Sequence, residues 1–378
     1  MLLHVHVGAL SLELYCQAAL VLKITTKRSL PMPTYDALFE SIHKLVMCHS
    51  PSGVEQEIDE FLRVRFEELG VAVSSDPSGN LIAKIPGTGG GHLAITAHKD
   101  EIGCIVTSLQ EEGRLKVRKL GGSFPWVYGE GVVDLLGDSR CINGVLSFGS
   151  RHVSHASPQS VHKDDAPLRW ADVWVETKLS AAELAEAGVR PGTRMVVGKH
   201  RKAPLRLNNH IASYTLDNKA SLAILLELAR RVSKPRPNVY LVASTKEEVG
   251  AVGALYFTQH QQVDALIALE ICPIAPEYSI EDGVNPVLLA EDSHGLYDET
   301  LNGCIRHAAK ELDIRMQLAV VCGFGSDGSN AMKYGHVPRA ACLGFPTQNT
   351  HGYEITHLGA VQNCAAILEE VCNRGLIW

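Results

Sequence analysis

Short apolar runs that alternate with helix-forming segments limit the possible folds of this chain more than any other feature. Four such runs are bounded by turn residues: 93–97, 239–243, 265–269 and 339–344. Helical periodicity appears between and after them, most clearly over residues 218–231 and in a final segment, 358–372. Strands that alternate with helices imply a sheet covered by helices on both faces. The sequence therefore predicts an α/β fold with a mixed sheet.

The segment from residue 104 to residue 207 interrupts this alternation. It has many short β-like runs, frequent glycine and one convincing helix at 181–187, where Ser180 and Glu183 form a capping box. We interpret it as an inserted β-rich domain. The predicted division is an N-terminal extension outside the core (1–31), the first part of the α/β domain (32–103), the inserted domain (104–207) and the second part of the α/β domain (208–378).

Two helices are expected before the first strands. The first begins near Tyr35, and the second is expected to start at a capping box formed by Ser52 and Glu55 and to end at Gly70. The short run 71–73 that follows has the composition of a strand.

Composition excludes several classes of protein. The net charge of −7 gives no basic footprint for nucleic acid. The apolar stretch 7–22 contains Glu13 and has its basic residues after it, unlike a secretory signal, and it is short for a membrane span. The ten cysteines form no C-x-x-C pair, which favours reduced, buried thiols. We expect a cytoplasmic protein that binds neither membranes nor nucleic acid.

Acidic and imidazole side chains stand where the apolar runs stop. In open α/β sheets, ligands bind beyond the carboxyl ends of the strands. Any one of these residues alone would more often be a surface residue, a turn residue or a helix cap, but their joint placement favours a site. The candidates are His98 and Asp100, Glu247 and Glu248, Glu270, His351, and Asp217 at the start of the helix 218–231.

These residue types suit a centre with two divalent metals. Two metals about 3.5–4 Å apart need a bridging carboxylate and further ligands for each metal. Imidazole and carboxylate without thiolate suit zinc, with cobalt and manganese as alternatives. Of the adjacent Glu247 and Glu248, one can bind metal while the other transfers a proton. Asp100, two residues after His98, can orient its imidazole.

Four motifs resemble one known family. They are His98-Lys-Asp100-Glu101-Ile-Gly, Leu216-Asp217-Asn218, Lys246-Glu247-Glu248-Val-Gly and Thr350-His351-Gly-Tyr-Glu. They resemble the co-catalytic metallo-aminopeptidases, in the family of the tetrahedral (TET) aminopeptidases and bacterial glutamyl aminopeptidases, some of which are named endoglucanases. The resemblance runs from about Met32 to the C-terminus. It includes the inserted segment, where Ala187-Gly-Val-Arg-Pro-Gly192 is similar to the family's return to the catalytic domain.

The resemblance implies a role for each candidate. His98 would bind one metal, Asp217 would bridge both, and Glu248 and His351 would hold the other. Glu247 would be the general base. Glu270 would complete the shell of the first metal, although the family is expected to carry Asp there, and Asn218 stands where an acidic residue is common. The implied fold is zinc-exopeptidase-like, with an inserted β-barrel-like dimerisation domain.

The implied function is a two-metal aminopeptidase that removes N-terminal residues from peptides with a metal-activated water. The implied assembly is a homo-oligomer in which dimers build a dodecamer. Two alternatives remain open: a glycoside hydrolase of the endoglucanase type, and a non-catalytic assembly protein on the same fold. Gly323-Phe-Gly325-Ser-Asp-Gly328 matches a dinucleotide-binding pattern, but no clear βαβ unit follows it, and we expect this loop to line the substrate cleft.

Overall fold

The computed structural model describes residues 31–150, 152, 154–156 and 167–375. The chain divides into a unit Met1–Met32 and a unit Pro33–Trp378, and every helix and strand named below belongs to the second unit. Residues 1–30 of the predicted N-terminal extension lie outside the described residues. Among the described helices, none is both long and apolar enough to cross a membrane.

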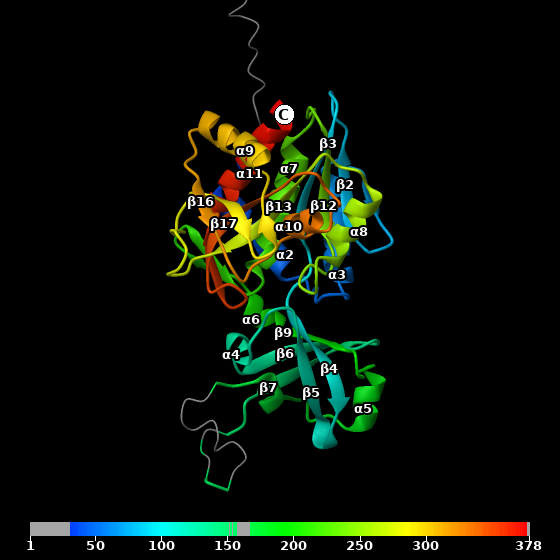
Figure 1. The fold of residues 1–378 in the computed structure, drawn as a ribbon. Coiled ribbons are helices and arrows are strands. Elements are labelled where there is room, and N and C mark those ends of the chain that lie inside the picture. Colours follow the sequence, from blue (N-terminus) through cyan, green and yellow to red (C-terminus); the bar gives the residue numbers. More distant parts are fainter. Residues whose placement is uncertain (1–30, 151, 153, 157–166, 376–378) are drawn as a thin grey trace, which may run out of the picture. The chain divides into compact units, whose positions relative to one another are not determined.

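A mixed sheet of twelve strands forms the α/β domain (Figure 1). Its centre is four parallel strands in the order β12-β3-β13-β17, and these are buried along almost their whole length. Parallel strands covered on both faces need continuous apolar runs, which explains the four runs in the sequence. The strands are β1 (Val73–Ser75), β2 (Leu81–Ile85), β3 (His92–His98), β10 (Leu205–Leu207), β11 (His210–Ser213), β12 (Asn238–Ser244), β13 (Ala265–Pro273), β14 (Val287–Asp292), β15 (Gly295–Leu296), β16 (Gln317–Val320), β17 (Ala340–Gln348) and β18 (Glu354–His357).

Helices pack on both faces of the sheet, as the sequence predicted. On one face, α7 (Leu216–Arg231) lies against β3 and β13, and it packs with α2 (Tyr35–Val46) and α11 (Leu358–Arg374). On the other face, α8 (Val252–His260) packs with α10 (Asp327–Lys333). The remaining long helices of this domain are α3 (Gln56–Glu68), beside β1 and β2, and α9 (Glu299–Glu311), beside α11.

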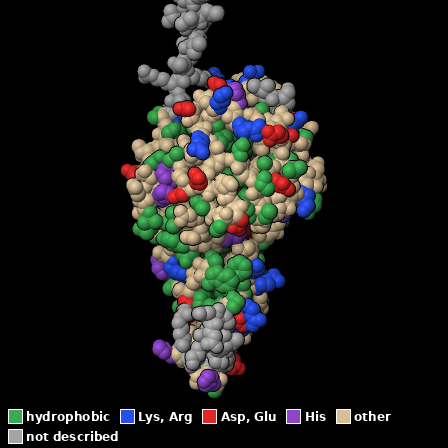
Figure 2. All heavy atoms as spheres, turned by 60° about the vertical axis from the view of Figure 1, so that its left-hand side comes forward, with side chains coloured by type: hydrophobic (Ala, Val, Ile, Leu, Met, Phe, Trp, Pro, Cys, Tyr) green, Lys and Arg blue, Asp and Glu red, His purple; other side chains and the backbone are tan. Residues whose placement is uncertain are grey.

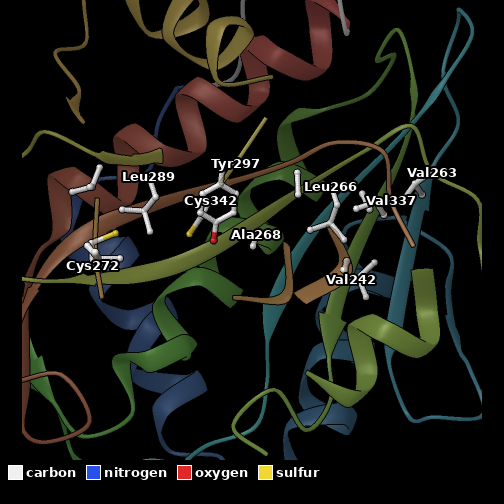
Figure 3. Close-up of a cluster of buried hydrophobic side chains, with 14 of the residues drawn as sticks. Val242, Val263, Leu266, Ala268, Cys272, Leu289, Tyr297, Val337 and Cys342 are labelled. Atoms are coloured by element: carbon white, nitrogen blue, oxygen red, sulfur yellow. The ribbon is translucent and has the colours of Figure 1, made fainter. Parts of the chain in front are cut away.

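Side-chain alternation along the parallel strands connects the core to the edge of the sheet. Figure 3 shows Val242 of β12, Leu266 and Ala268 of β13 and Cys342 of β17 in one buried cluster. Successive side chains of a strand point to opposite faces, so alternate residues share a face. The face that carries Leu266 and Ala268 therefore continues to Glu270. By the same alternation, His98 lies on the apolar face of β3 and Ser244 on that of β12, each at the carboxyl end of its strand.

A closed six-stranded barrel is inserted between β3 and β10. Its strand order is β4-β5-β8-β7-β6-β9, and it has a separate apolar core. This confirms the β-rich insertion and its barrel-like form. Its elements are β4 (Gly103–Leu109), β5 (Arg114–Leu120), α4 (Pro125–Tyr128), β6 (Gly131–Leu136), β7 (Cys141–Ser147), β8 (Trp174–Glu176), α5 (Ala181–Glu186), β9 (Arg194–Val197) and α6 (Lys199–Lys202), with short 3-10 turns at Glu111–Gly113 and Trp170–Asp172.

Some local predictions hold and others are wrong. The Ser180–Glu183 capping box is present at the start of α5. The predicted box of Ser52 with Glu55 is wrong, because α3 starts at Gln56 with no side-chain cap bond. The Ser52 hydroxyl donates instead to an Asp100 carboxylate oxygen at 2.6 Å. The run 71–73 is shifted, since β1 begins at Val73.

The barrel is joined to the α/β domain through a buried polar junction. The ammonium of Lys202 donates to both carboxylate oxygens of Glu101, at 2.9 and 3.1 Å, and both side chains are almost fully buried. Burial alone would raise the pKa of Glu101, but the charge of Lys202 and the nearby imidazole of His49, whose Nδ1 atom lies 3.8 Å away, hold it well below its usual value. The other ring nitrogen of His49 lies 2.8 Å from Asp134 of β6.

We predict that Lys202→Met destabilises the protein strongly, because it leaves the Glu101 carboxylate buried without its cation. Breaking such a buried pair costs about 3–5 kcal/mol. The measurement is the free energy of unfolding in urea. The control is Lys178→Met, which removes a cation that lies 2.8 Å from Glu176 and is 70% exposed. An exposed pair contributes about 0–1 kcal/mol, so equal losses in both variants would contradict the prediction.

Candidate metal and catalytic site

The register of the parallel strands brings His98 and Glu270 together. His98 is the last residue of β3 and pairs with Ser244, the last residue of β12. On its other side β3 pairs with β13, which continues through Glu270 to Pro273. The prediction that the strand stops before Glu270 is therefore wrong. The Nε2 atom of His98 lies 4.0 Å from Oε2 of Glu270.

Asp217 lies between two imidazoles. Its Oδ1 atom is 2.9 Å from Nε2 of His98, and its Oδ2 atom is 3.4 Å from Nε2 of His351. Asp217 stands at the start of α7 with a non-helical backbone, and its peptide bond to Asn218 is cis. The Asn218 amide donates to the carbonyl of Leu269 at 2.7 Å, a bond that a carboxylate at this position could not make.

His351 comes from the loop between β17 and β18, and Glu248 comes from the loop after β12. The Nε2 atom of His351 lies 3.9 Å from Oε1 of Glu248. Three strand ends and one helix start thus meet at one point, although the residues are separated by up to 253 positions in the sequence (98 to 351).

Backbone carbonyls hold the outer nitrogen of each imidazole. Nδ1 of His98 donates to the carbonyl of Asp100 at 3.0 Å, and Nδ1 of His351 donates to the carbonyl of Gly122 at 2.6 Å. When Nδ1 carries the proton, the neutral ring offers the lone pair of Nε2. Both Nε2 atoms face Asp217, so both rings are oriented as metal ligands commonly are.

Carboxyl groups are crowded around these imidazoles. Burial, opposed in part by the charge of His351 and reinforced by the charge of Asp217, raises the pKa of Glu248 to about 7. Burial also raises the pKa of Glu247 and of Glu270 well above the usual value, with a further increase from neighbouring carboxylates. Burial raises the pKa of Asp327 to about 6. So many buried acids in one place are stabilised when a cation binds among them.

The donor set fits a divalent cation. His98, Asp217 and Glu248 can each place a ligand atom within 4.8 Å of the others. No lysine or arginine of the described residues lines the cavity that contains them. Imidazole and carboxylate donors are those that zinc, cobalt and manganese accept.

Comparison with protein families shows where the chain belongs. The model of the M42 glutamyl aminopeptidase family matches residues 79–367. The chain belongs to this family. It is 23% identical over 330 residues to the glutamyl aminopeptidase of Lactococcus lactis subsp. cremoris (strain MG1363), an alignment that covers 84% of this chain and 90% of the relative.

Two solved structures share the fold. The TET aminopeptidase of a marine sediment Thaumarchaeota archaeon (SCGC AB-539-E09) has a TM-score of 0.82 at 22% identity, covering 90% of this chain and 97% of that chain. The TET1 peptidase of Pyrococcus horikoshii, described as assembling into a tetrahedron or a large octahedral shell, has a TM-score of 0.78 at 24% identity, covering 89% of this chain and 99% of that chain.

Family membership decides the reaction class. M42 aminopeptidases are metal-dependent peptidases, and the chain is an M42 aminopeptidase with a possible metal site at His98, Asp217 and Glu248. The two alternatives, a glycoside hydrolase and a non-catalytic assembly protein, are not favoured. A glycoside hydrolase works with two carboxylates and needs no imidazole ligands.

A cavity of about 560 Å³ opens over the M42 site. The glycine-rich loop lines it through residues 323–325, as the sequence predicted. The barrel also lines the cavity, through Gly122, Phe124 and Val127. The cleft of this aminopeptidase therefore has walls from both the α/β domain and the barrel.

Asp100 and Glu354 hold the backbone of the candidate ligands in place through hydrogen bonds. One Asp100 carboxylate oxygen accepts the amide N–H of Glu247 at 2.9 Å, and the other accepts the amide N–H of Glu248 at 3.3 Å. The Asp100 carboxylate lies 3.5 Å from the His98 ring, whose hydrogen bond goes to the Asp100 carbonyl. Asp100 therefore also holds the loop of the two glutamates in place.

Glu354 was not among the predicted site residues. Its two carboxylate oxygens accept the amide N–H groups of Asp217 and His351, each at 2.9 Å. Burial and the charge of Asp217 raise its pKa to about 8. The sequence signal that could have identified Glu354 was its position in the motif. It stands three residues after His351, from where its carboxylate can accept the His351 amide N–H. Asp327, which accepts the Ser244 hydroxyl at 2.6 Å, belongs to the glycine-rich motif that was expected to line the cleft.

We predict that Glu354→Gln weakens divalent metal binding by about 10–100-fold, because an amide cannot accept both N–H groups and leaves Asp217 and His351 less well oriented. The measurement is the metal dissociation constant in competition with a chelator. The control is Glu299→Gln, which alters an exposed carboxylate on α9. An unchanged dissociation constant in Glu354→Gln would refute the role.

Proposed function

We propose that this chain is a two-metal aminopeptidase that removes single residues from the free amino end of peptides. The observation that carries the proposal is the placement of Asp217, whose two oxygens face two different imidazoles. A carboxylate shared in this way is what a pair of divalent ions requires.

The ligands divide into two groups around Asp217. His98 and Glu270 would hold one ion, and His351 and Glu248 would hold the other, with zinc the first candidate and cobalt or manganese the alternatives. Glu270 is one methylene longer than the expected Asp, and its distance of 4.0 Å from His98 supports a place in the first group. When bound, the ions supply a Lewis acid for the scissile carbonyl and lower the pKa of water.

Glu247 is the proposed general base. It lines the cavity beside the ligands, and its amide is held by Asp100. Burial raises its pKa well above that of an ordinary glutamate, which suits a group that accepts a proton from the attacking water and returns it to the leaving amine. The adjacent Glu248 lies beside His351, which supports its role as a ligand rather than as the base.

The acidic cleft supports action at free amino ends. Two divalent ions would neutralise about four of the carboxylate charges. The remaining negative charge attracts an α-ammonium group, and an acetylated end lacks that positive charge.

Self-association belongs to the same proposal. The TET1 peptidase of P. horikoshii assembles into a shell, and this chain shares its fold over most of its length. We infer that copies of this chain join through the barrel. A monomer mass for the wild-type chain in light scattering would contradict this inference.

We predict stepwise shortening of free peptides. Matched peptides with free and acetylated amino ends, followed by mass spectrometry over time with zinc, cobalt or manganese present, should give a ladder from the free peptide alone. Internal fragments from both peptides would exclude an aminopeptidase. Cleavage of carboxymethylcellulose in place of peptides would restore the glycoside hydrolase alternative.

We predict that Glu247→Gln lowers kcat by about 10²–10⁴-fold, because the proton acceptor is lost while the ligands remain. Elemental analysis should still find about two divalent ions per chain, because Asp217, the proposed bridging ligand, is unchanged in this variant. The control is Glu277→Gln, an exposed residue that lines the same cavity. Loss of metal in Glu247→Gln would instead make Glu247 a ligand and reverse its role with Glu248.

A further inference from the structure

An exposed aromatic pair stands on the barrel at the rim of the cleft. The rings of Phe124 and Trp126 stack with centroids 4.5 Å apart and planes inclined by 11°. Each residue is 51% exposed, although aromatic side chains of this size are usually largely buried. Figure 2 shows hydrophobic side chains gathered on the barrel surface next to the α/β domain, on the side where α4 lies in Figure 1.

The backbone on either side of the pair is anchored by buried contacts. Tyr128, at the end of α4, is buried, and its carbonyl accepts hydrogen bonds from Arg201 and, at 3.2 Å, from the Tyr214 hydroxyl. Its ring meets Trp170 edge to face, and the Trp170 indole donates to the carbonyl of Ser123 at 2.9 Å. Anchoring the backbone on both sides of the pair lowers the entropic cost of ordering this segment when a partner binds.

The pair is continuous with the catalytic cleft. Phe124 lines the same cavity as His98, Asp217 and Glu270, and Trp126 stacks on Phe124 and extends this wall to the outer surface. The ammonium of Lys119 lies 5.7 Å from the centre of the Phe124 ring, which adds a cation–π contact to this wall. An apolar wall thus leads from the metal ligands to the solvent.

We propose that Phe124 and Trp126 form a subsite for the part of the peptide that follows the scissile bond, and that they favour an apolar or aromatic second residue. The proposal rests on the proposed aminopeptidase function. An aminopeptidase holds a single residue before the scissile bond, so only the leaving portion is long enough to reach the rim. The acidic inner cleft attracts the ammonium group, whereas the exposed rings offer apolar contacts to the departing chain.

The test compares peptides that share their first residue and differ at the second. For tetrapeptides with Phe, Leu or Gly at the second position, the wild-type enzyme should prefer Phe and Leu over Gly in kcat/KM by about tenfold. Trp126→Ala and Phe124→Ala should abolish this preference, mainly through KM, while Trp126→Phe keeps most of it. Hydrolysis of the amide of the first amino acid, which has no second residue, should fall much less than hydrolysis of the peptide with Phe at the second position.

The control is Tyr334→Ala, which removes an aromatic side chain that is 62% exposed and does not line the cavity. Thermal unfolding shows whether each variant is folded. The subsite is refuted if the wild-type preference is absent, if it survives in both alanine variants, or if hydrolysis of the amide falls as much as hydrolysis of the peptides.

A lower particle mass for Trp126→Ala would show that the pair joins copies of the chain instead. A wild-type enzyme that cleaves no peptide would refute the aminopeptidase proposal itself.

Discussion

The carboxylate of Asp217 between two imidazoles is the interaction on which the rest of the site depends. It places one oxygen against His98 and the other against His351, which approach from different parts of the chain. A carboxylate in this position keeps its geometry only if its backbone is fixed. Glu354 fixes this backbone by accepting the amide N–H groups of both Asp217 and His351. One buried carboxylate therefore aligns the start of α7 with the loop between β17 and β18.

The barrel contributes to this geometry as well as to the cleft wall. The carbonyl of Gly122 accepts the Nδ1 proton of His351, which fixes the direction of Nε2. A Cβ atom at Gly122 would lie 3.0 Å from the His351 ring, and one at Gly121, where φ is +80°, would lie 2.9 Å from a carboxylate oxygen of Glu248. Close approach without a side chain is what glycine allows. The loop after β5 therefore brings the barrel backbone directly against the side chains of the α/β domain.

Much of the architecture was predictable, because strand and helix periods are local properties. The four central strands, α2, α7 and α11 arise from continuous apolar runs or from helical spacing, and the loss of alternation after residue 103 marked the barrel. Predictions were wrong where a polar side chain had a distant partner. Ser52 was expected to cap a helix, but its hydroxyl reaches Asp100, 48 residues away in the sequence. A strand was expected to stop at Leu269, just before Glu270, but pairing with β17 extends β13 to Pro273.

The sequence by itself determined the α/β class, the inserted β-rich segment and the set of candidate ligands. The ends of parallel strands meet at one edge of a sheet, and the sequence shows which residue types stand at those ends. Only the tertiary structure decided how those side chains are oriented. The two sides of Asp217, the carbonyls behind each imidazole, and the roles of Glu354 and of Phe124 beside the cleft depend on contacts between segments far apart in the chain. Local periodicity carries no information about such contacts, because they are set by strand register and by the docking of the barrel.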